Sequence, residues 1–202
     1  MVEVDLYSKY RDLFISLKVI VSETEHRVVT NEPDVLFIEN VNFFVKSYLV
    51  NACTYLESFL QDYAFNYAVR INSKLKGVEI PYNFLYWMIS KDIKDKDLKF
   101  ICADFKINKK SISEEISANP YKTIKLFRLL GVNLCSSDVF ERLKDFVNGV
   151  VIKRNNIIHH NDDALDISFS DINSYIDVFL EYMRAITDVI EVNTNSTKYQ
   201  SA

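Results

Sequence analysis

Residues 40–75 read NVNFFVKSYLVNACTYLESFLQDYAFNYAVRINSKL, and their apolar side chains recur at steps of three and four residues. That spacing places these side chains on one broad face of an α-helix. No proline interrupts the stretch, and Gly77 follows it where helices commonly stop. We therefore expect one long helix from about Asn40 to Leu75 with an extensive buried face.

The same periodicity occurs on both sides of this helix. Each further segment is bounded by residues that start or stop helices, such as Pro33, Pro120 and Gly131. The predicted helices run from Leu6 to about Val28, from Pro120 to Leu130, from Ser137 onward, and from about Ile172 to Val192. The break between the first two lies at residues 31–34.

Residues 78–119 are predicted to form an insertion of short helices, the first of them opened by Pro81. Lysines are interleaved there with Phe100 and Phe105, which could make a patch that faces a substrate. The alternative is a solvated surface, because neighbouring aspartates cancel much of the charge. We favour the solvated surface.

Composition supports an all-α domain. The chain has 202 residues, of which 49% are hydrophobic, and only three glycines and three prolines. Few turn formers favour long helices over a sheet with many turns. We expect an antiparallel helical bundle with four to five core helices, forming a single domain over residues 1–192, and a disordered tail at 193–202.

The charged, cysteine and apolar residues also limit the partners, the metal or disulfide sites and the cellular location that we expect. The formal charge of −4 gives no overall attraction to nucleic acid, so any RNA contact needs a local basic patch. Cys53, Cys102 and Cys135 are widely spaced and predict neither a disulfide framework nor a zinc site. No signal peptide or membrane span is expected. We expect a cytoplasmic protein that uses no metal and no cofactor.

A polar run follows the apolar face of the helix that begins at Ser137. It reads KRNNIIHHND at residues 153–162 and holds two of the three histidines of the chain. Imidazole can move protons near neutral pH, and a guanidinium can hold a phosphate through two parallel hydrogen bonds. The run therefore contains the groups needed to cleave a phosphodiester without a metal, with Lys153 as a candidate RNA contact.

If the helix continues through this run, the polar side chains fall into pairs. Asn155 and His159 are four residues apart and share one face, as do Asn156 and His160. Arg154 and His159 are five residues apart, which is roughly 140° around an ideal helix. These two side chains would then bracket a groove, either between helices or between subunits.

Arg154 continues the apolar stripe of its helix, so its guanidinium lies near buried neighbours and needs a partner of opposite charge. Glu57, at the edge of the stripe on the long helix, is the candidate. Asp62 and Asp162 are less attractive because both are expected to be more exposed. A purely structural salt bridge remains open for Arg154.

The histidines also have alternative interpretations. His159 lies where a helix end would attract a cation, which is a common structural use of histidine. His160 is interpreted as an exposed neighbour rather than the catalytic group.

The pattern of Arg154, Asn155, three further residues and His159 resembles the signature of HEPN domains. In that signature an arginine, usually followed by a polar residue, precedes a histidine by four to six residues. The order of the other features is also similar: Glu57 on an earlier core helix, the turn at Gly131, and a final helix over residues 170–190. The resemblance spans roughly residues 40–190 and is closest to the branch of bacterial defence and toxin systems.

The resemblance implies a metal-independent endoribonuclease that works as a homodimer with a composite active site. His159 would act as the general base or acid, and Arg154 would stabilise the charge on the transition state. Asn155 would hold the scissile phosphate or fix the imidazole tautomer, and Glu57 would orient Arg154. RNA is the implied substrate, with tRNA as one candidate, and an antitoxin or other regulator is a candidate partner.

Two departures from the family pattern leave alternatives open. A glycine often follows the histidine in the family, whereas this chain has His160 and then Asn161, so His160 and Asn156 stay secondary candidates. The insertion at 78–119 has no counterpart. Some relatives use the same bundle without catalysis to bind a partner or a nucleotide, and this is the alternative function.

Overall fold

The computed structural model describes residues 5–30, 32, 34–75, 77–90, 94–160 and 162–196. The described residues are predominantly helical, which confirms the predicted all-α class. The α-helices are α1 (Leu6–Val29), α2 (Val35–Glu39), α3 (Val41–Leu75), α4 (Tyr82–Ser90), α5 (Lys109–Glu115), α6 (Pro120–Leu129), α7 (Asp138–His160) and α8 (Phe169–Ser196). Two short 3-10 helices, Asp95–Asp97 and Leu134–Ser136, lie between them.

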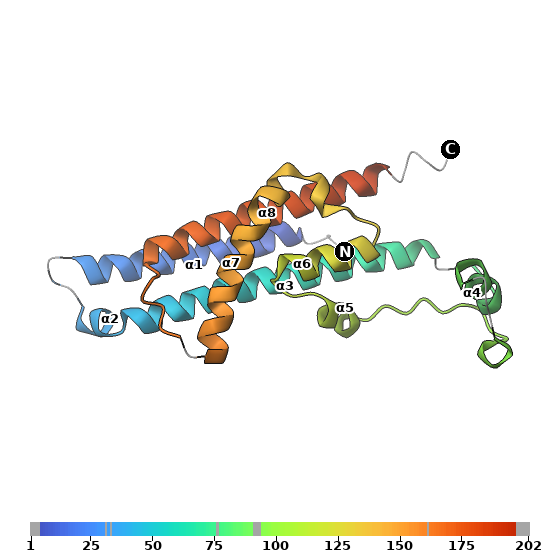
Figure 1. Ribbon diagram of the computed structural model, residues 1–202. Helices are drawn as coiled ribbons and strands as arrows, with labels where there is room; N and C mark the ends of the chain where they lie inside the picture. Colours follow the sequence, from blue (N-terminus) through green and yellow to red (C-terminus); the bar gives the residue numbers. More distant parts are fainter. Residues whose placement is uncertain are drawn as a thin grey trace.

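Helices α1, α3 and α8 lie lengthwise beside one another, and α1 runs opposite to the other two (Figure 1). Helix α7 crosses this layer and packs against α8 and α3. The apolar faces of these helices meet in one continuous core. Its largest fully buried side chains include Phe14, Phe59, Phe140, Phe179 and Tyr182.

Local signals fix the ends of the two helices that precede the polar run. Asn119 caps α6 by accepting hydrogen bonds from the backbone N–H groups of Tyr121 and Lys122. Gly131 ends α6 with a φ of 80°, a conformation that glycine adopts without strain. The N–H of Val132 then donates to the carbonyl of Phe127, which completes a Schellman turn. The predicted stop at Gly131 is confirmed.

Several helix boundaries differ from the expected ones. Helix α2 lies where only a break followed by the long helix was expected, and Asp34 caps it by accepting from the N–H of Leu36. Helix α8 extends through Ser196, beyond the expected end at Val192. Parts of three expectations lie outside the described residues: Asn31 and Pro33 in the break, Asn161 in the polar run, and the tail from 197 onward.

The expected insertion at 78–119 divides into two parts. Residues from Asn108 belong to the bundle, since Ile112, Ile116 and Ala118 are buried in the core. Helix α4 instead lies apart from the bundle beyond the C-terminal end of α3, and none of its residues is buried (Figure 1). The predicted C-terminal boundary of the insertion, at residue 119, was therefore too far along the chain. The sequence of a short apolar segment does not show by itself what that segment packs against.

The excursion that carries α4 leaves the bundle and returns to it at nearly the same place. Residues 77–78 at its start and 103–107 at its end line one hollow together with Asn72 and Leu75 of α3. Inside the excursion, Pro81 and Cys102 form an isolated antiparallel bridge.

Some apolar side chains of the predicted helices are exposed. They include Leu13 and Ile20 in α1, Leu129 in α6, and Phe146 and Ile158 in α7. Leu13, Ile20 and Phe146 lie at the margins of the buried faces of their helices. Leu129 lies on the opposite side of α6, and Ile158 lies beyond Val151, the last buried residue of α7. No helix of the described chain is both long and apolar enough to cross a membrane.

Candidate active site

Helix α7 carries the polar run to its C-terminal end, since it continues without a break from Asp138 through His160. Its first part is anchored in the core by Phe140, Val147 and Val150, all of them buried. Ser137 precedes it and accepts a hydrogen bond from the N–H of Phe140. The predicted continuation of this helix through the run is confirmed, so its buried part sets the position of Arg154.

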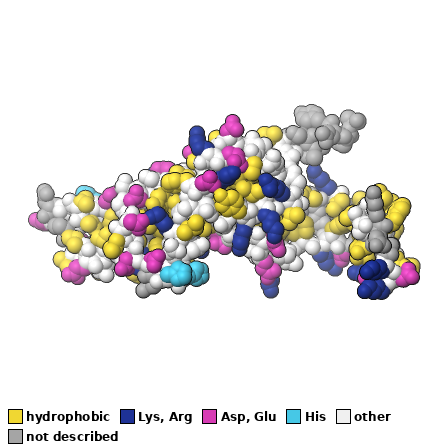
Figure 2. Space-filling view, in the orientation of Figure 1, with side chains coloured by type: hydrophobic (Ala, Val, Ile, Leu, Met, Phe, Trp, Pro, Cys, Tyr) yellow, Lys and Arg dark blue, Asp and Glu magenta, His cyan; other side chains and the backbone are white. Residues whose placement is uncertain are grey.

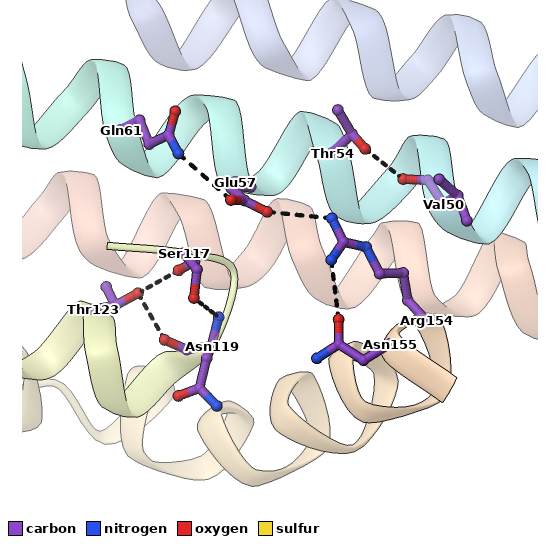
Figure 3. Close-up of polar contacts among 9 residues, drawn as sticks. All are labelled: Val50, Thr54, Glu57, Gln61, Ser117, Asn119, Thr123, Arg154 and Asn155. Carbon is purple, nitrogen blue, oxygen red and sulfur yellow. Dashed lines mark hydrogen bonds and ion pairs between the residues drawn. The ribbon is translucent and has the colours of Figure 1, made fainter. Parts of the chain in front are cut away.

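Arg154 pairs with Glu57 across the contact between α7 and α3 (Figure 3). The guanidinium Nη2 lies 3.3 Å from Glu57 Oε2, and the two side chains are 19% and 27% exposed. The predicted pairing of these two residues is confirmed. A half-buried pair of this kind fixes the plane of the guanidinium, while solvent still reaches the pair.

Asn155 contacts the same guanidinium from the neighbouring position on α7. Arg154 Nη1 donates to Asn155 Oδ1 at 3.0 Å. The amide nitrogen of Asn155 donates to no residue that the structure describes. Because an arginine has five N–H donors, the contacts with Asn155 and Glu57 leave donors on both terminal nitrogens for an anion.

The groups beneath the pair are buried. Arg154 Nε is buried without a partner among the described residues. Cys53, one turn before Glu57 on α3, is fully buried, and this burial raises the pKa of its thiol to about 12. The thiol is therefore neutral near pH 7, and the charges that act on it are those of Arg154 and Glu57.

His159 and His160 are exposed in the last turn of α7. Histidines form a visible patch on the surface at this end of the helix (Figure 2). Neither imidazole bonds to a residue in the described part of the chain. The structure therefore brings Arg154, Asn155 and Glu57 together, but it does not bring the imidazoles of the same chain into contact with them.

The loop after α7 is tied to α3. Asp163 accepts hydrogen bonds from Asn42 at 3.0 Å and from Lys46 at 3.1 Å. The hydrogen bond from Lys46 is the main reason that the pKa of Asp163 is lowered. Asn42 also accepts from the N–H of Ala164, so this loop is held at two consecutive residues.

Lys153 and Asn156 face this loop rather than Arg154. Lys153 forms an ion pair with Asp166, which raises the pKa of the lysine. Asn156 and Lys153 line a hollow of about 230 Å³ together with Asp162 and Asp166. The role of Lys153 in RNA binding stays a prediction, and its observed contact is with the loop.

The expected exposure of Asp62 is wrong. Its side chain is 19% exposed, which is less than that of Glu57. Asp62 accepts a hydrogen bond from Tyr10 at 2.7 Å and pairs with Lys109. Its partners therefore come from α1 and α5, while Asp162 lies exposed in the loop.

Sequence reasoning missed Gln61. Its amide nitrogen lies 3.5 Å from Glu57 Oε1, so Glu57 contacts Gln61 through one oxygen and Arg154 through the other (Figure 3). The signal was present, because residues four apart on a helix are neighbours on its surface.

Within the described part of the chain, no three His, Cys, Asp or Glu side chains gather as metal ligands would. The three cysteines are free thiols.

The all-α bundle, with Arg154 near the end of α7, Glu57 opposite it on α3 and His159 five residues later, is similar to the arrangement expected from the resemblance to HEPN domains. The sequence model of the family described as RiboL-PSP-HEPN matches residues 8–192, and the chain belongs to this HEPN family. No curated protein and no solved structure matches the chain.

Proposed function

We propose that this HEPN domain is a metal-independent endoribonuclease whose site is built on Arg154, Asn155, Glu57 and His159. One observation carries the proposal: Glu57 and Asn155 fix the guanidinium of Arg154, and an exposed imidazole follows one to two turns later on the same helix. Preorganised donors of this kind stabilise charge that develops in a transition state.

In the proposed reaction, an imidazole removes the proton of a ribose 2′-hydroxyl, and the 2′-oxygen attacks the adjacent phosphorus. The bond from phosphorus to the 5′-oxygen breaks, and the leaving oxygen takes up a proton from an imidazolium. Arg154 stabilises the negative charge on the phosphorane, with Asn155 as a further donor. The products are a 2′,3′-cyclic phosphate and a 5′-hydroxyl, and DNA is not cleaved because it lacks the attacking hydroxyl.

The geometry of α7 supports a site shared by two copies of the chain. Arg154 points toward α3, whereas His159 lies roughly 140° farther around the helix and about 7.5 Å farther along its axis. A single α7 therefore directs the two groups apart. In a homodimer, the histidine of one copy can approach a phosphate held by the arginine of the other.

A binding role without catalysis is the alternative. It is favoured by the contacts that Arg154 already makes and by the net charge of −4. In that case Arg154 is a structural residue, and the exposed histidines have no catalytic task.

Incubation of the purified protein with total tRNA and with structured RNA in excess chelator tests the proposal. We expect cleavage by the wild type, products that end in 2′,3′-cyclic phosphate, and a loss of at least about 100-fold in rate for His159→Ala. His160→Ala, measured in parallel, decides between the two neighbouring imidazoles.

His26→Ala is the matched control, since His26 is an exposed histidine in the last turn of α1 and outside the site. This variant should cleave at the wild-type rate. A folded His159→Ala/His160→Ala protein that cuts RNA as fast as the wild type would overturn the mechanism. If neither the wild type nor any variant cleaves RNA at high protein concentration, the result would favour the binding role.

A further inference from the structure

Helix α4 is an apolar element that makes no extended contact with another helix in the described part of the chain. Its exposed large apolar side chains are Phe84, Trp87, Met88 and Ile89, of which Ile89 is 76% exposed. Phe84, Trp87 and Met88 follow the spacing i, i+3 and i+4, so they lie on one helical face. A helix that is apolar on nearly all sides is normally buried, and α4 is not.

The return segment of the same excursion enlarges this surface. Phe100 is 92% exposed and Ile101 is 61% exposed. The N–H of Tyr82 donates to the carbonyl of Ile101, which holds this segment beside the start of α4. We call α4 together with Phe100 and Ile101 the α4 patch.

The α4 patch is large enough for a stable protein contact. An aromatic side chain can bury about 150–250 Å², so the three exposed aromatics and three aliphatic side chains present on the order of 700 Å². A standard interface buries about 800 Å² on each partner, and an unpaired apolar patch of this size marks an interaction site.

The charge around the patch selects the kind of partner. Over residues 77–106 the lysines and the carboxylates are equal in number. RNA and anionic membranes attract surfaces with a net positive charge, which this segment lacks. Lys94, Asp95, Lys96 and Asp97 alternate in sign, so a second copy related by a two-fold axis can place lysines opposite aspartates.

We propose that the α4 patch is a self-association surface, through which two copies of this chain pack α4 against α4. Figure 2 shows hydrophobic side chains at this end of the molecule together with both basic and acidic ones, away from the histidine patch. The contact is thus separate from the candidate active site, and it does not depend on the proposed nuclease activity.

Trp87 gives a direct readout, since it is the only tryptophan in the chain and is 54% exposed in the single copy. We expect its fluorescence to shift to shorter wavelength and to become protected from acrylamide as protein concentration rises. Dilution should reverse both changes. Sedimentation equilibrium of the same samples should show the mass rising over the same concentration range.

Met88→Glu should prevent this association without unfolding the bundle, because α4 contributes no buried residue. Its Trp87 should stay accessible at every concentration, and its average mass should stay below that of the wild type at concentrations at which Trp87 of the wild type is protected. Leu129→Glu is the matched control: Leu129 is an exposed leucine on α6, and its replacement should leave both readouts unchanged.

Any of three results would overturn the proposal. Trp87 could stay accessible at all concentrations, Met88→Glu could associate as the wild type does, or Trp87 could be protected in a species with the mass of one chain. Parallel titrations with tRNA and with vesicles of phosphatidylcholine and phosphatidylglycerol test other occupants. Protection that arises only with one of these would assign the patch to that ligand instead of a second copy.

Discussion

Glu57 and Asp62 are two half-buried carboxylates on α3, five residues apart, with different surroundings. Asp62 is held by Tyr10 and Lys9 from α1 and by Lys109 from α5. Among the described residues, Glu57 has one charged partner, Arg154, at 3.3 Å, and a neutral neighbour, Gln61, at 3.5 Å. The first carboxylate joins three helices, whereas the second orients a single guanidinium.

This comparison separates a structural polar cluster from a candidate site. Removing a residue that joins several helices leaves several partners unpaired, so stability falls. Removing a residue that orients one group near solvent should lower stability less than removing a residue that joins several helices, and it should lower activity more. Variants at the two positions should therefore affect different measurements.

The largest expected effect is on activity. Arg154→Asn should lower the rate of RNA cleavage by about 100- to 1,000-fold, the usual loss when a donor to a transition-state oxyanion is removed. The free energy of unfolding should change by about 1 kcal/mol or less, because Glu57 retains access to water. Cleavage assays and urea denaturation measure the two effects. A large loss of stability would instead identify a structural ion pair and favour the binding role.

The next effect is on stability. Asp62→Ala should lower the free energy of unfolding by about 2 kcal/mol, because the hydroxyl of Tyr10 loses its charged acceptor while it stays buried. Urea denaturation of this variant and the wild type measures the difference. Cleavage per folded molecule should be unchanged, and a loss of activity comparable to that of Arg154→Asn would remove the distinction between the two carboxylates.

A smaller effect is expected from pH. Burial alone would raise the pKa of Asp62, but the hydrogen bonds from Lys109 and Tyr10 outweigh it and hold the pKa below its ordinary value of 3.8. The stabilisation is therefore present above pH 3.8 and is lost as the pH falls through the lowered pKa of the folded state. The difference in unfolding free energy between wild type and Asp62→Asn should shrink over this acidic range, as urea denaturation at successive pH values would show. A difference that stays constant would contradict the assigned role of Asp62.

The sequence predicted the long helices and the Arg154–Glu57 pair for the same reason. Both depend on apolar periodicity, which assigns the long helices and also places Arg154 and Glu57 at the margins of facing stripes. Asp62 was misjudged in part because one of its partners, Lys109, comes from α5, a short helix that periodicity does not reveal. Helix α2 was missed for the same reason, since a helix of five residues is stabilised by its cap and its neighbours.

The histidines mark the limit of sequence reasoning at the site. Spacing on α7 predicted which polar groups share a face, and the helix continues as expected. Neither imidazole of His159 and His160 bonds to another described residue, so no pattern within the chain could have predicted a contact for them.

The excursion that carries α4 has an evolutionary consequence. Its two ends meet at the hollow beside Asn72 and Leu75, and α4 contributes nothing to the core. Insertions whose ends lie close together can be gained, lost or replaced without repacking the domain that bears them. Residues 78–106 are therefore free to diverge under selection for what they contact, while selection for stability acts on the helices of the bundle.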